Sequence, residues 1–133
     1  MSRELDIRTH ELMDRPLCGE PLELTDGRAR VALETVERMR ADATGLVHGG
    51  FVFSLADHAA MLAVNHANVV LGSATTRFLA PVRCGERLEA VAEIDRHEGK
   101  KIIVAVEVLR DGEPVMTGEM VCFTPGKHVL DNP

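Results

Sequence analysis

The sequence predicts an α+β protein in which a mostly antiparallel sheet of five to six strands wraps around one long central helix. Three observations predict this architecture. The stretch 48–67 repeats small and apolar residues at steps of three and four, which is the period of a helix buried on most of its sides. The other long segments alternate apolar and polar residues as strands do. Turn signals that contain glycine separate several of these segments.

Two of the expected strands precede the helix. The segments 20–25 and 28–36 both alternate, and Asp26-Gly27 between them is a hairpin turn signal. Four strand-like segments follow the helix without any further helical pattern, at 69–79, 86–97, 101–111 and 113–124. One helix cannot cover both faces of so long a sheet, so the bare face and the exposed edge strand predict a two-fold homodimer.

The N-terminal region differs from the rest of the chain. In the segment 3–15, Leu5, Leu12 and Met13 lie among charges and predict a short amphipathic helix that Pro16 ends. A length of 133 residues fits one domain over 1–133, with 1–19 as an N-terminal helix or extension.

The composition argues against several classes of partner. A net charge of −6 and a pI near 5.5 disfavour nucleic acid and anionic membranes, which both bind basic surfaces. The charged N-terminus lacks the apolar core of a signal peptide, and no stretch is long enough to span a bilayer, so we expect a cytoplasmic protein. The wide spacing of Cys18, Cys84 and Cys122 fits neither a disulfide framework nor a metal clamp.

The segment 45–57 carries the residues with chemical potential. Gly49 and Gly50 lie at the expected start of the helix, where free N–H groups and the helix dipole favour developing negative charge. Asp57 interrupts a helix that is otherwise small and apolar, and a carboxylate buried there is unfavourable unless function or a partner compensates. These residues predict an oxyanion hole and a catalytic carboxylate.

The spacing of these residues predicts a shared active site. Gly49 and Asp57 are eight residues apart, so on one helix they are separated by about 12 Å, too far to act on one carbonyl. Two such helices packed antiparallel across a two-fold axis would place Asp57 of one subunit beside Gly49 of the other. We therefore expect a site that only the dimer completes.

Several motifs over residues 20–124 resemble those of one family. They are G-x-x-H-G-G at 45–50, L-A-D ending nine residues after His48, F-L-x-P at 78–81 followed by G-x-x-L, and a G-K turn before a long strand. In this order they are similar to the hotdog-fold thioesterases of the phenylacetyl-CoA thioesterase (PaaI) type. The resemblance implies hydrolysis of an acyl-CoA thioester by a homodimer or a dimer of dimers, without a metal and with coenzyme A only as part of the substrate.

The resemblance also implies roles for individual residues. Asp57 would act as nucleophile or general base, the Gly49 N–H would polarise the thioester carbonyl with Gly50 beside it, and His48 would orient the loop or the substrate. The family commonly has Asn six residues before the His, where this chain has Asp42, which accepts hydrogen bonds rather than donating them. A hydroxyl from the strand after the helix often assists, and Ser73, Thr75 and Thr76 are the candidates here.

Basic residues are candidates for binding the phosphates of coenzyme A. Arg83 and Lys100 are the first of these, with Arg87 and Lys101 beside them, although charges in turns are commonly just solvated.

Other readings of the same residues stay open. The fold could serve as a non-catalytic acyl-CoA binding module, and a hydratase or dehydratase of the same fold is a weaker third possibility. Asp57 could pair with an arginine at a dimer seam, and the glycines could simply allow close helix packing. His48, His58 and His66 do not share the helix face that a metal site would need.

Overall fold

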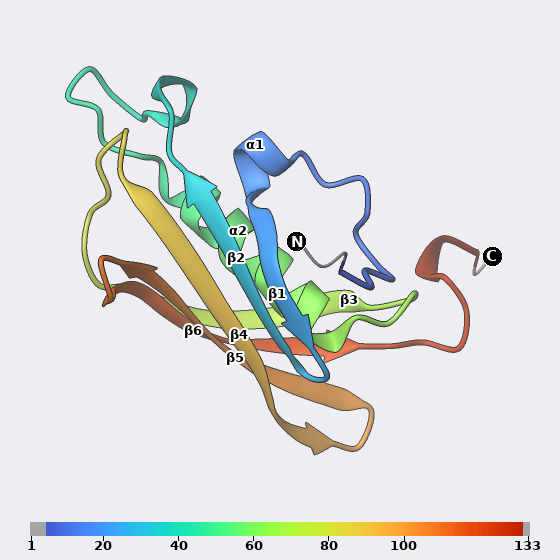
Figure 1. Cartoon of the computed structure of the whole chain (residues 1–133). Coiled ribbons are helices and arrows are strands. Elements are labelled where there is room, and N and C mark those ends of the chain that lie inside the picture. The colour runs from blue at the N-terminus through green and yellow to red at the C-terminus, as the bar shows by residue number, and fades with distance from the viewer. Residues whose placement is uncertain (1–4, 132–133) are drawn as a thin grey trace.

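The computed structural model describes residues 5–131 and shows a six-stranded antiparallel sheet curled around one long helix (Figure 1). The order of the strands in the sheet is β1-β2-β4-β5-β6-β3, so β1 and β3 form its two edges. The elements in chain order are α1 (Arg15–Cys18), β1 (Glu20–Thr25), β2 (Arg28–Glu34), the 3₁₀ turn η1 (Glu37–Met39), α2 (Gly49–Val64), β3 (Val70–Phe78), β4 (Arg87–Glu98), β5 (Lys101–Arg110), β6 (Glu113–Phe123) and the 3₁₀ turn η2 (Val129–Asp131). The expected α+β architecture, with its single long helix and six strands, is confirmed.

The central helix α2 packs against the inner face of the sheet through small side chains. Four alanines, at positions 56, 59, 60 and 63, are buried with at most 1% of their surface exposed, so the helix backbone approaches the strands closely. The helix ends at Asn65, which takes a left-handed conformation with φ of 50° and donates its N–H to the Met61 carbonyl. The helical segment expected over 48–67 is therefore confirmed, with ends at Gly49 and Val64.

The N-terminal helix expected over 3–15 is wrong for the part of it that the structure describes. Residues 5–14 form no helix, and the short helix α1 begins where the expected one should end. Asp14 caps α1 by accepting a hydrogen bond from the Leu17 N–H at 3.2 Å, and Pro16 lies in the first turn, where its missing N–H is not needed. The sequence Asp-x-Pro thus starts a helix here. Residues 3 and 4 lie outside the described part.

The N-terminal segment lies against the C-terminal end of α2 instead. The Asn65 side chain accepts a hydrogen bond from the Arg8 N–H and donates one to the Asp6 carbonyl, both at 2.8 Å. Farther along, the buried His58 ring on α2 lies 3.1 Å from the Cys18 carbonyl through Nδ1, which identifies Nδ1 as the protonated nitrogen. These contacts hold the segment before β1 onto the helix.

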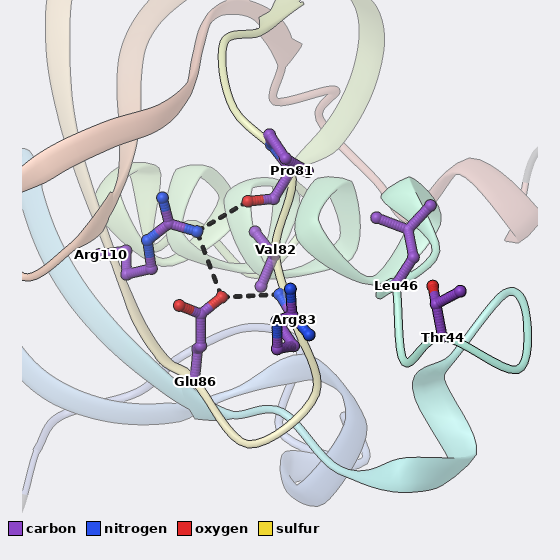
Figure 2. Close-up of a pocket in the computed structure, with 7 residues that line it drawn as sticks. All are labelled: Thr44, Leu46, Pro81, Val82, Arg83, Glu86 and Arg110. Atoms are coloured by element: carbon purple, nitrogen blue, oxygen red, sulfur yellow. Dashed lines mark hydrogen bonds and ion pairs between the residues drawn. The ribbon is translucent and has the colours of Figure 1, made fainter.

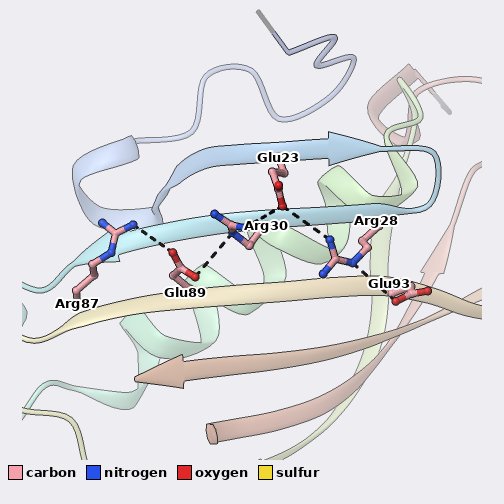
Figure 3. A network of polar contacts seen from close by, with 6 residues as sticks. All are labelled: Glu23, Arg28, Arg30, Arg87, Glu89 and Glu93. Atoms are coloured by element: carbon pink, nitrogen blue, oxygen red, sulfur yellow. Dashed lines mark hydrogen bonds and ion pairs between the residues drawn. The ribbon is translucent and has the colours of Figure 1, made fainter. Parts of the chain in front are cut away.

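Ion pairs cover the outer face of the sheet over β1, β2 and β4 (Figure 3). Arginines and glutamates alternate across these strands at distances of 3.0 to 3.9 Å, and the members drawn are Glu23, Arg28, Arg30, Arg87, Glu89 and Glu93. Each pair is partly exposed, so each adds little stability by itself. Together they pair the positive charges on this face with negative ones, and the charge of Arg87 is among those paired.

None of the helices within residues 5–131 combines the length and the apolar composition needed to span a bilayer.

The buried His58 predicts a pH dependence of stability. Burial lowers the pKa of the His58 imidazole below its ordinary value of 6.5, so just below that pH the unfolded chain binds a proton that the folded chain does not. The free energy of unfolding should therefore fall as the pH is lowered below 6.5, and should not change from this source above it. Burial gives His10 a contribution of the same sign.

Urea unfolding of the parent, His58→Asn and His97→Asn at about pH 7.5 and about pH 5.5 measures this effect. We expect the difference between the two pH values to shrink in His58→Asn and to stay unchanged in His97→Asn, whose parent side chain is exposed. An equal difference in all three proteins would contradict the assignment.

Candidate active site

The N-terminal end of α2 presents free amide groups. His48 precedes the helix in an extended conformation, with φ of −62° and ψ of 132°, and its side chain does not cap the helix. Within residues 5–131, the N–H groups of Gly49 and Gly50 have no hydrogen-bond acceptor. Two unpaired donors at the positive end of a 16-residue helix form a site for negative charge.

An apolar groove of about 300 Å³ adjoins these amides. Phe78 and Leu79 at the end of β3 form one wall and are more than half exposed. The other lining residues are Val47, Gly49, Val52, Ala80, Pro81 and Val82. Phe78 lies directly over Gly49, because a Cβ added at Gly49 would be 3.5 Å from its ring. The groove is the kind of surface on which the apolar part of a ligand can lie beside a polarised carbonyl.

A short ladder of backbone hydrogen bonds fixes the loop before α2. The Val47 N–H donates to the Val82 carbonyl and the Cys84 N–H donates to the Gly45 carbonyl, both at 2.8 Å. Leu46 and Arg83 face each other in an antiparallel bridge. The position of Gly49 therefore depends on the loop 80–86, which begins within the F-L-A-P motif.

The His48 ring lies over the first turn of the helix. Its centroid is 6.3 Å from that of Phe51 in an edge-to-face arrangement. A Cβ added at Gly50 would lie 3.0 Å from the His48 ring, so a side chain there would push the ring aside by a few tenths of an ångström. His48 itself is exposed and close enough to act on a ligand or on the loop.

Asp57 lies two turns farther along α2 in an unusual environment. Its side chain is half-buried, and its Oδ1 atom is buried without a hydrogen-bond partner among the described residues. Burial raises the pKa of the Asp57 carboxyl above its ordinary range. The buried Cys122 thiol on β6 is affected by the same carboxylate. Burial, and secondarily the negative charge of Asp57, raise the pKa of the Cys122 thiol to about 12. Cys122 is therefore a protonated, inert thiol.

Asp42 holds a turn rather than facing Asp57. Its carboxylate accepts hydrogen bonds from the Thr44 hydroxyl at 2.6 Å and the Thr44 N–H at 2.9 Å, and it is exposed. These hydrogen bonds, the hydroxyl first, lower the pKa of Asp42. Asp42 therefore caps the loop before Gly45.

The hydroxyl candidates on β3 point to different faces of the sheet. Residues directly opposite each other in a sheet share a face, and Thr76 pairs with Gly118, which in turn pairs with the core residue Val106. Ser73 and Thr75 pair with Val121 and Glu119 on the other face. Within one chain, Thr76 is thus on the side of α2, and Ser73 and Thr75 are on the side away from it.

A bulge in β3 causes this reversal. The register shifts between Leu71 and Ser73, so Gly72 is an extra residue, and a Cβ there would collide with the Phe123 ring. Leu71 packs against the core. In a regular strand every second residue shares a face, so without the bulge Ser73 and Thr75 would lie on the same face as Leu71.

The two basic candidates for phosphate lie apart. Arg83 follows the F-L-A-P motif and lines a cavity of about 370 Å³ near the start of β4 (Figure 2). Lys100 lies in the turn after β4, at the other end of a 12-residue strand that spans roughly 40 Å. One chain does not bring them to the same ligand.

Sequence reasoning missed two residues of that cavity. Arg110 at the end of β5 donates through Nη1 to the Pro81 carbonyl at 2.7 Å and to Glu86 at 3.2 Å. Glu86 also accepts the Arg83 N–H at 2.6 Å. No motif marks these residues, because their contacts join segments far apart in the sequence.

The described residues contain no group of three or more His, Cys, Asp or Glu side chains placed to hold a metal ion. His58 is engaged with Cys18, and His66 accepts the Asn68 N–H through Nδ1 at 3.0 Å. All three cysteines are free.

Comparison with solved structures gives close matches to the whole fold. An uncharacterized protein from Pyrococcus horikoshii is 50% identical, with a TM-score of 0.93 over 98% of this chain and 100% of that one. An asparagine-to-aspartate variant of the phenylacetic acid degradation protein PaaI from Thermus thermophilus is 32% identical, with a TM-score of 0.76 over 82% of this chain and 95% of that one.

Curated relatives match over only part of their own length. A methylthioribose-1-phosphate isomerase from Aquifex aeolicus is 48% identical over 115 residues, which are 86% of this chain and 25% of that protein. A transcription factor FapR from a Thermoanaerobacter species is 30% identical over 104 residues, which are 77% of this chain and 52% of that protein. The chain thus spans about a quarter of the first relative and about half of the second.

The family itself is marked by residues 44–117, which match the model of the thioesterase superfamily. This range includes the loop before α2, the whole of α2 and the strand carrying Phe78. Together with the antiparallel sheet and its central helix, the match shows that the chain is a hotdog-fold member of the thioesterase superfamily, of the PaaI type.

Proposed function

We propose that the chain hydrolyses an acyl-CoA thioester to the free acid and coenzyme A, in a site formed by two copies of the chain. The observation that supports this most is the pairing, on one helix, of unpaired amide donors at Gly49 and Gly50 with an unpaired, half-buried carboxyl at Asp57. Ester hydrolysis requires hydrogen-bond donors for the oxyanion. It also requires a carboxylate that can take a proton from water or attack the carbonyl carbon.

The proposed roles follow from these positions. The thioester carbonyl oxygen accepts a hydrogen bond from the Gly49 N–H, and the helix dipole stabilises the negative charge that develops on it. The acyl group or the adjoining arm lies in the groove under Phe78. His48, which directly precedes Gly49, orients the substrate. The reaction uses water and needs neither a metal nor a redox cofactor.

Asp57 has two possible chemical roles in this scheme. As a general base it takes a proton from water, whose oxygen bonds to the acyl carbon while the carbon–sulfur bond breaks and the thiolate gains the proton. As a nucleophile its oxygen bonds to the acyl carbon while the carbon–sulfur bond breaks and the thiolate leaves. Water then adds to the acyl carbon of the resulting anhydride, which releases the free acid and the Asp57 carboxylate, and the proton lost by water passes to the thiolate. Both roles need the ionised carboxylate, and the raised pKa brings its basicity closer to that of a useful proton acceptor.

The separation of Gly49 and Asp57 supports a shared site. Eight residues of α2 put them about 12 Å apart, so one chain does not bring both to one carbonyl. Among residues 5–131, strand β3 pairs with β6 alone, which leaves its other edge open along nine residues. Pairing of this edge with the same edge of a second copy would set two α2 helices antiparallel on one side of a continuous sheet. We propose this dimer, alone or within a dimer of dimers.

A second candidate is a binding module that holds an acyl-CoA without hydrolysing it. The relatives named as transcription factors support this candidate, since this chain matches about half of the length of proteins that are not named as enzymes. Measurable binding of acyl-CoAs, without turnover that depends on Asp57 for any acyl group in a panel, would favour this candidate over the enzyme.

Replacing Asp57 tests the catalytic carboxylate. Asp57→Asn is nearly isosteric and removes the base or nucleophile, so kcat on the best acyl-CoA should fall by about 10² or more. The parent rate should rise with pH through the raised pKa of Asp57, because the ionised form is the active one. Release of the thiol, followed with a thiol reagent, measures both effects.

Ser54→Ala, one turn earlier on α2, is the control for disturbance of the helix. An Asp57→Asn variant that keeps kcat within a few-fold of the parent would remove Asp57 from the mechanism.

Replacing Gly49 tests the amide donor. Gly49 is the first residue of α2, and His48 already has the extended conformation that a following proline requires. Gly49→Pro therefore deletes the N–H at a position that accepts proline, and kcat should fall by about 10² to 10³. Gly49→Ala keeps the N–H, and its Cβ would be 3.5 Å from Phe78, so kcat should stay within a few-fold.

Mixing the two inactive variants tests whether the site is shared. Light scattering should first show a mass of twice the 14.5 kDa chain, or a multiple of that dimer. After unfolding and refolding Asp57→Asn together with Gly49→Pro, one of the two sites in each mixed dimer is intact and activity should return. A monomeric parent, or a mixture as inactive as its components, would contradict the shared site.

Asp42 is expected to hold the loop rather than to act on the substrate. Asp42→Asn keeps an acceptor for the Thr44 groups, so kcat should stay within a few-fold of the parent. Asp42→Ala removes it and should lower the free energy of unfolding by about 0.5 to 2 kcal/mol. Enhanced kcat in Asp42→Asn would instead place the carboxylate beside the oxyanion, and a large loss would make that carboxylate part of the chemistry.

A further inference from the structure

The apolar groove beside Gly49 and the charged cavity shown in Figure 2 share part of their lining. Pro81 and Val82 line both, so the two volumes, about 300 and about 370 Å³, are neighbours along the loop 80–86. The groove is apolar and the cavity is not: its lining is Thr44, Leu46, Pro81, Val82, Arg83, Glu86 and Arg110. A ligand that fills both must be apolar at one end and polar at the other.

The cavity has a net positive charge in a chain whose net charge is −6. Arg83 and Arg110 contribute two guanidinium groups, and Glu86 is the one carboxylate in the lining. That carboxylate accepts hydrogen bonds from the Arg83 N–H and from Arg110 Nη1, so much of its charge is already balanced. An anion entering the cavity meets an excess of positive charge.

The Arg83 guanidinium does not contribute to holding the fold together. It makes no ion pair or hydrogen bond with any residue in the part of the chain that the structure describes, and its side chain is exposed. Most other arginines there are paired with carboxylates, including Arg87 close by. Arg38 and Arg77 also lack an ion pair among the described residues, but Arg83 is the unpaired arginine that lines this cavity, so its guanidinium is available to a ligand there.

We propose that this cavity binds the phosphorylated end of the thioester substrate, with Arg83 contacting phosphate and Arg110 holding the cavity wall in place. The inference rests on the proposed hydrolysis of a coenzyme A thioester. It places the phosphates on the same subunit that supplies Gly49, and it assigns them to Arg83 and not to Lys100, which is at the far end of β4.

The separation between the two ends of the site fits such a ligand. Leu46 faces Arg83 in the antiparallel bridge, and Gly49 is three residues beyond Leu46. Three residues of extended chain measure roughly 10 Å, and the long Arg83 side chain extends the distance further. The pantetheine arm of coenzyme A is a flexible chain that separates a thioester from its phosphates by more than this backbone distance. It would follow Pro81 and Val82, which line both the groove and the cavity.

The sharpest test compares two thioesters of the same acyl group. One carries coenzyme A, and the other carries N-acetylcysteamine, which has the amide next to the thioester but no phosphate. Arg83→Gln should raise KM for the coenzyme A thioester by about tenfold, with kcat within a few-fold, because one charge-assisted contact to bound phosphate is lost. It should leave KM for the N-acetylcysteamine thioester unchanged. The hydrogen bonds of Arg83 that hold the loop are made by its backbone, so the variant should fold.

Lys127→Gln is the matched control, since it removes an exposed positive charge from the C-terminal segment. It should leave both KM values unchanged. A KM that rises equally for both thioesters in Arg83→Gln, or for neither, would overturn the subsite.

Binding of coenzyme A itself separates the subsite from the reaction. Calorimetry should show that Arg83→Gln weakens coenzyme A binding by about tenfold relative to the parent and to Lys127→Gln. A parent that binds coenzyme A in this Arg83-dependent manner but hydrolyses no thioester would keep the subsite and refute the hydrolysis. If the parent hydrolyses both thioesters and Arg83→Gln has the same KM values, the hydrolysis is kept and the subsite is refuted.

Discussion

The close packing of α2 against the sheet is the constraint on which the rest of the molecule depends. The helix presents alanines to the strands, and at this short distance neither the helix nor the sheet can shift without opening voids or clashing. The packing fixes the two ends of α2. One end exposes amide groups over a groove, and the other is held by Asn65 and the N-terminal segment. Asp57 lies between these ends and is half-buried, with its Oδ1 atom shielded from solvent.

An unpaired carboxyl in such a place is informative because proteins usually satisfy buried polar atoms. Had Asp57 been needed only for structure, a strand amide or an arginine would be expected against its Oδ1 atom, and none of the described residues supplies one. His58, the next residue, shows the contrast, since its ring is buried deeper and bonded to a backbone carbonyl. Adjacent positions on one helix thus hold a side chain that is satisfied within the chain and one that is not, and the second is the one to which we assign the proposed catalytic role.

Sequence periodicity predicted the architecture well because helix and strand periods reflect which face is buried. It failed where local chemistry overrides the pattern. In the N-terminal segment, apolar spacing suggested a helix, but Leu12 is 99% exposed and the helix signals at Asp14 and Pro16 begin a different, shorter one. In β3, one bulge at Gly72 moved Ser73 and Thr75 to the face away from α2. The Phe123 ring leaves no room for a side chain at Gly72, and this contact between strands is not encoded in the local sequence.

The candidate site divides in the same way. Gly49, Gly50 and Asp57 could be chosen as candidates from the sequence because each is out of place in an ordinary buried helix. The charged cavity was not, because Arg110 reaches it from the end of β5 and Glu86 from the start of β4. What distinguishes Arg83 is also invisible in sequence: its guanidinium stays unpaired among the described residues, whereas Arg87 four positions later is held between two glutamates. The arginines on the outer face of the sheet over β1, β2 and β4 are paired with glutamates, whereas Arg83 is unpaired and lines a cavity that shares Pro81 and Val82 with the groove beside Gly49.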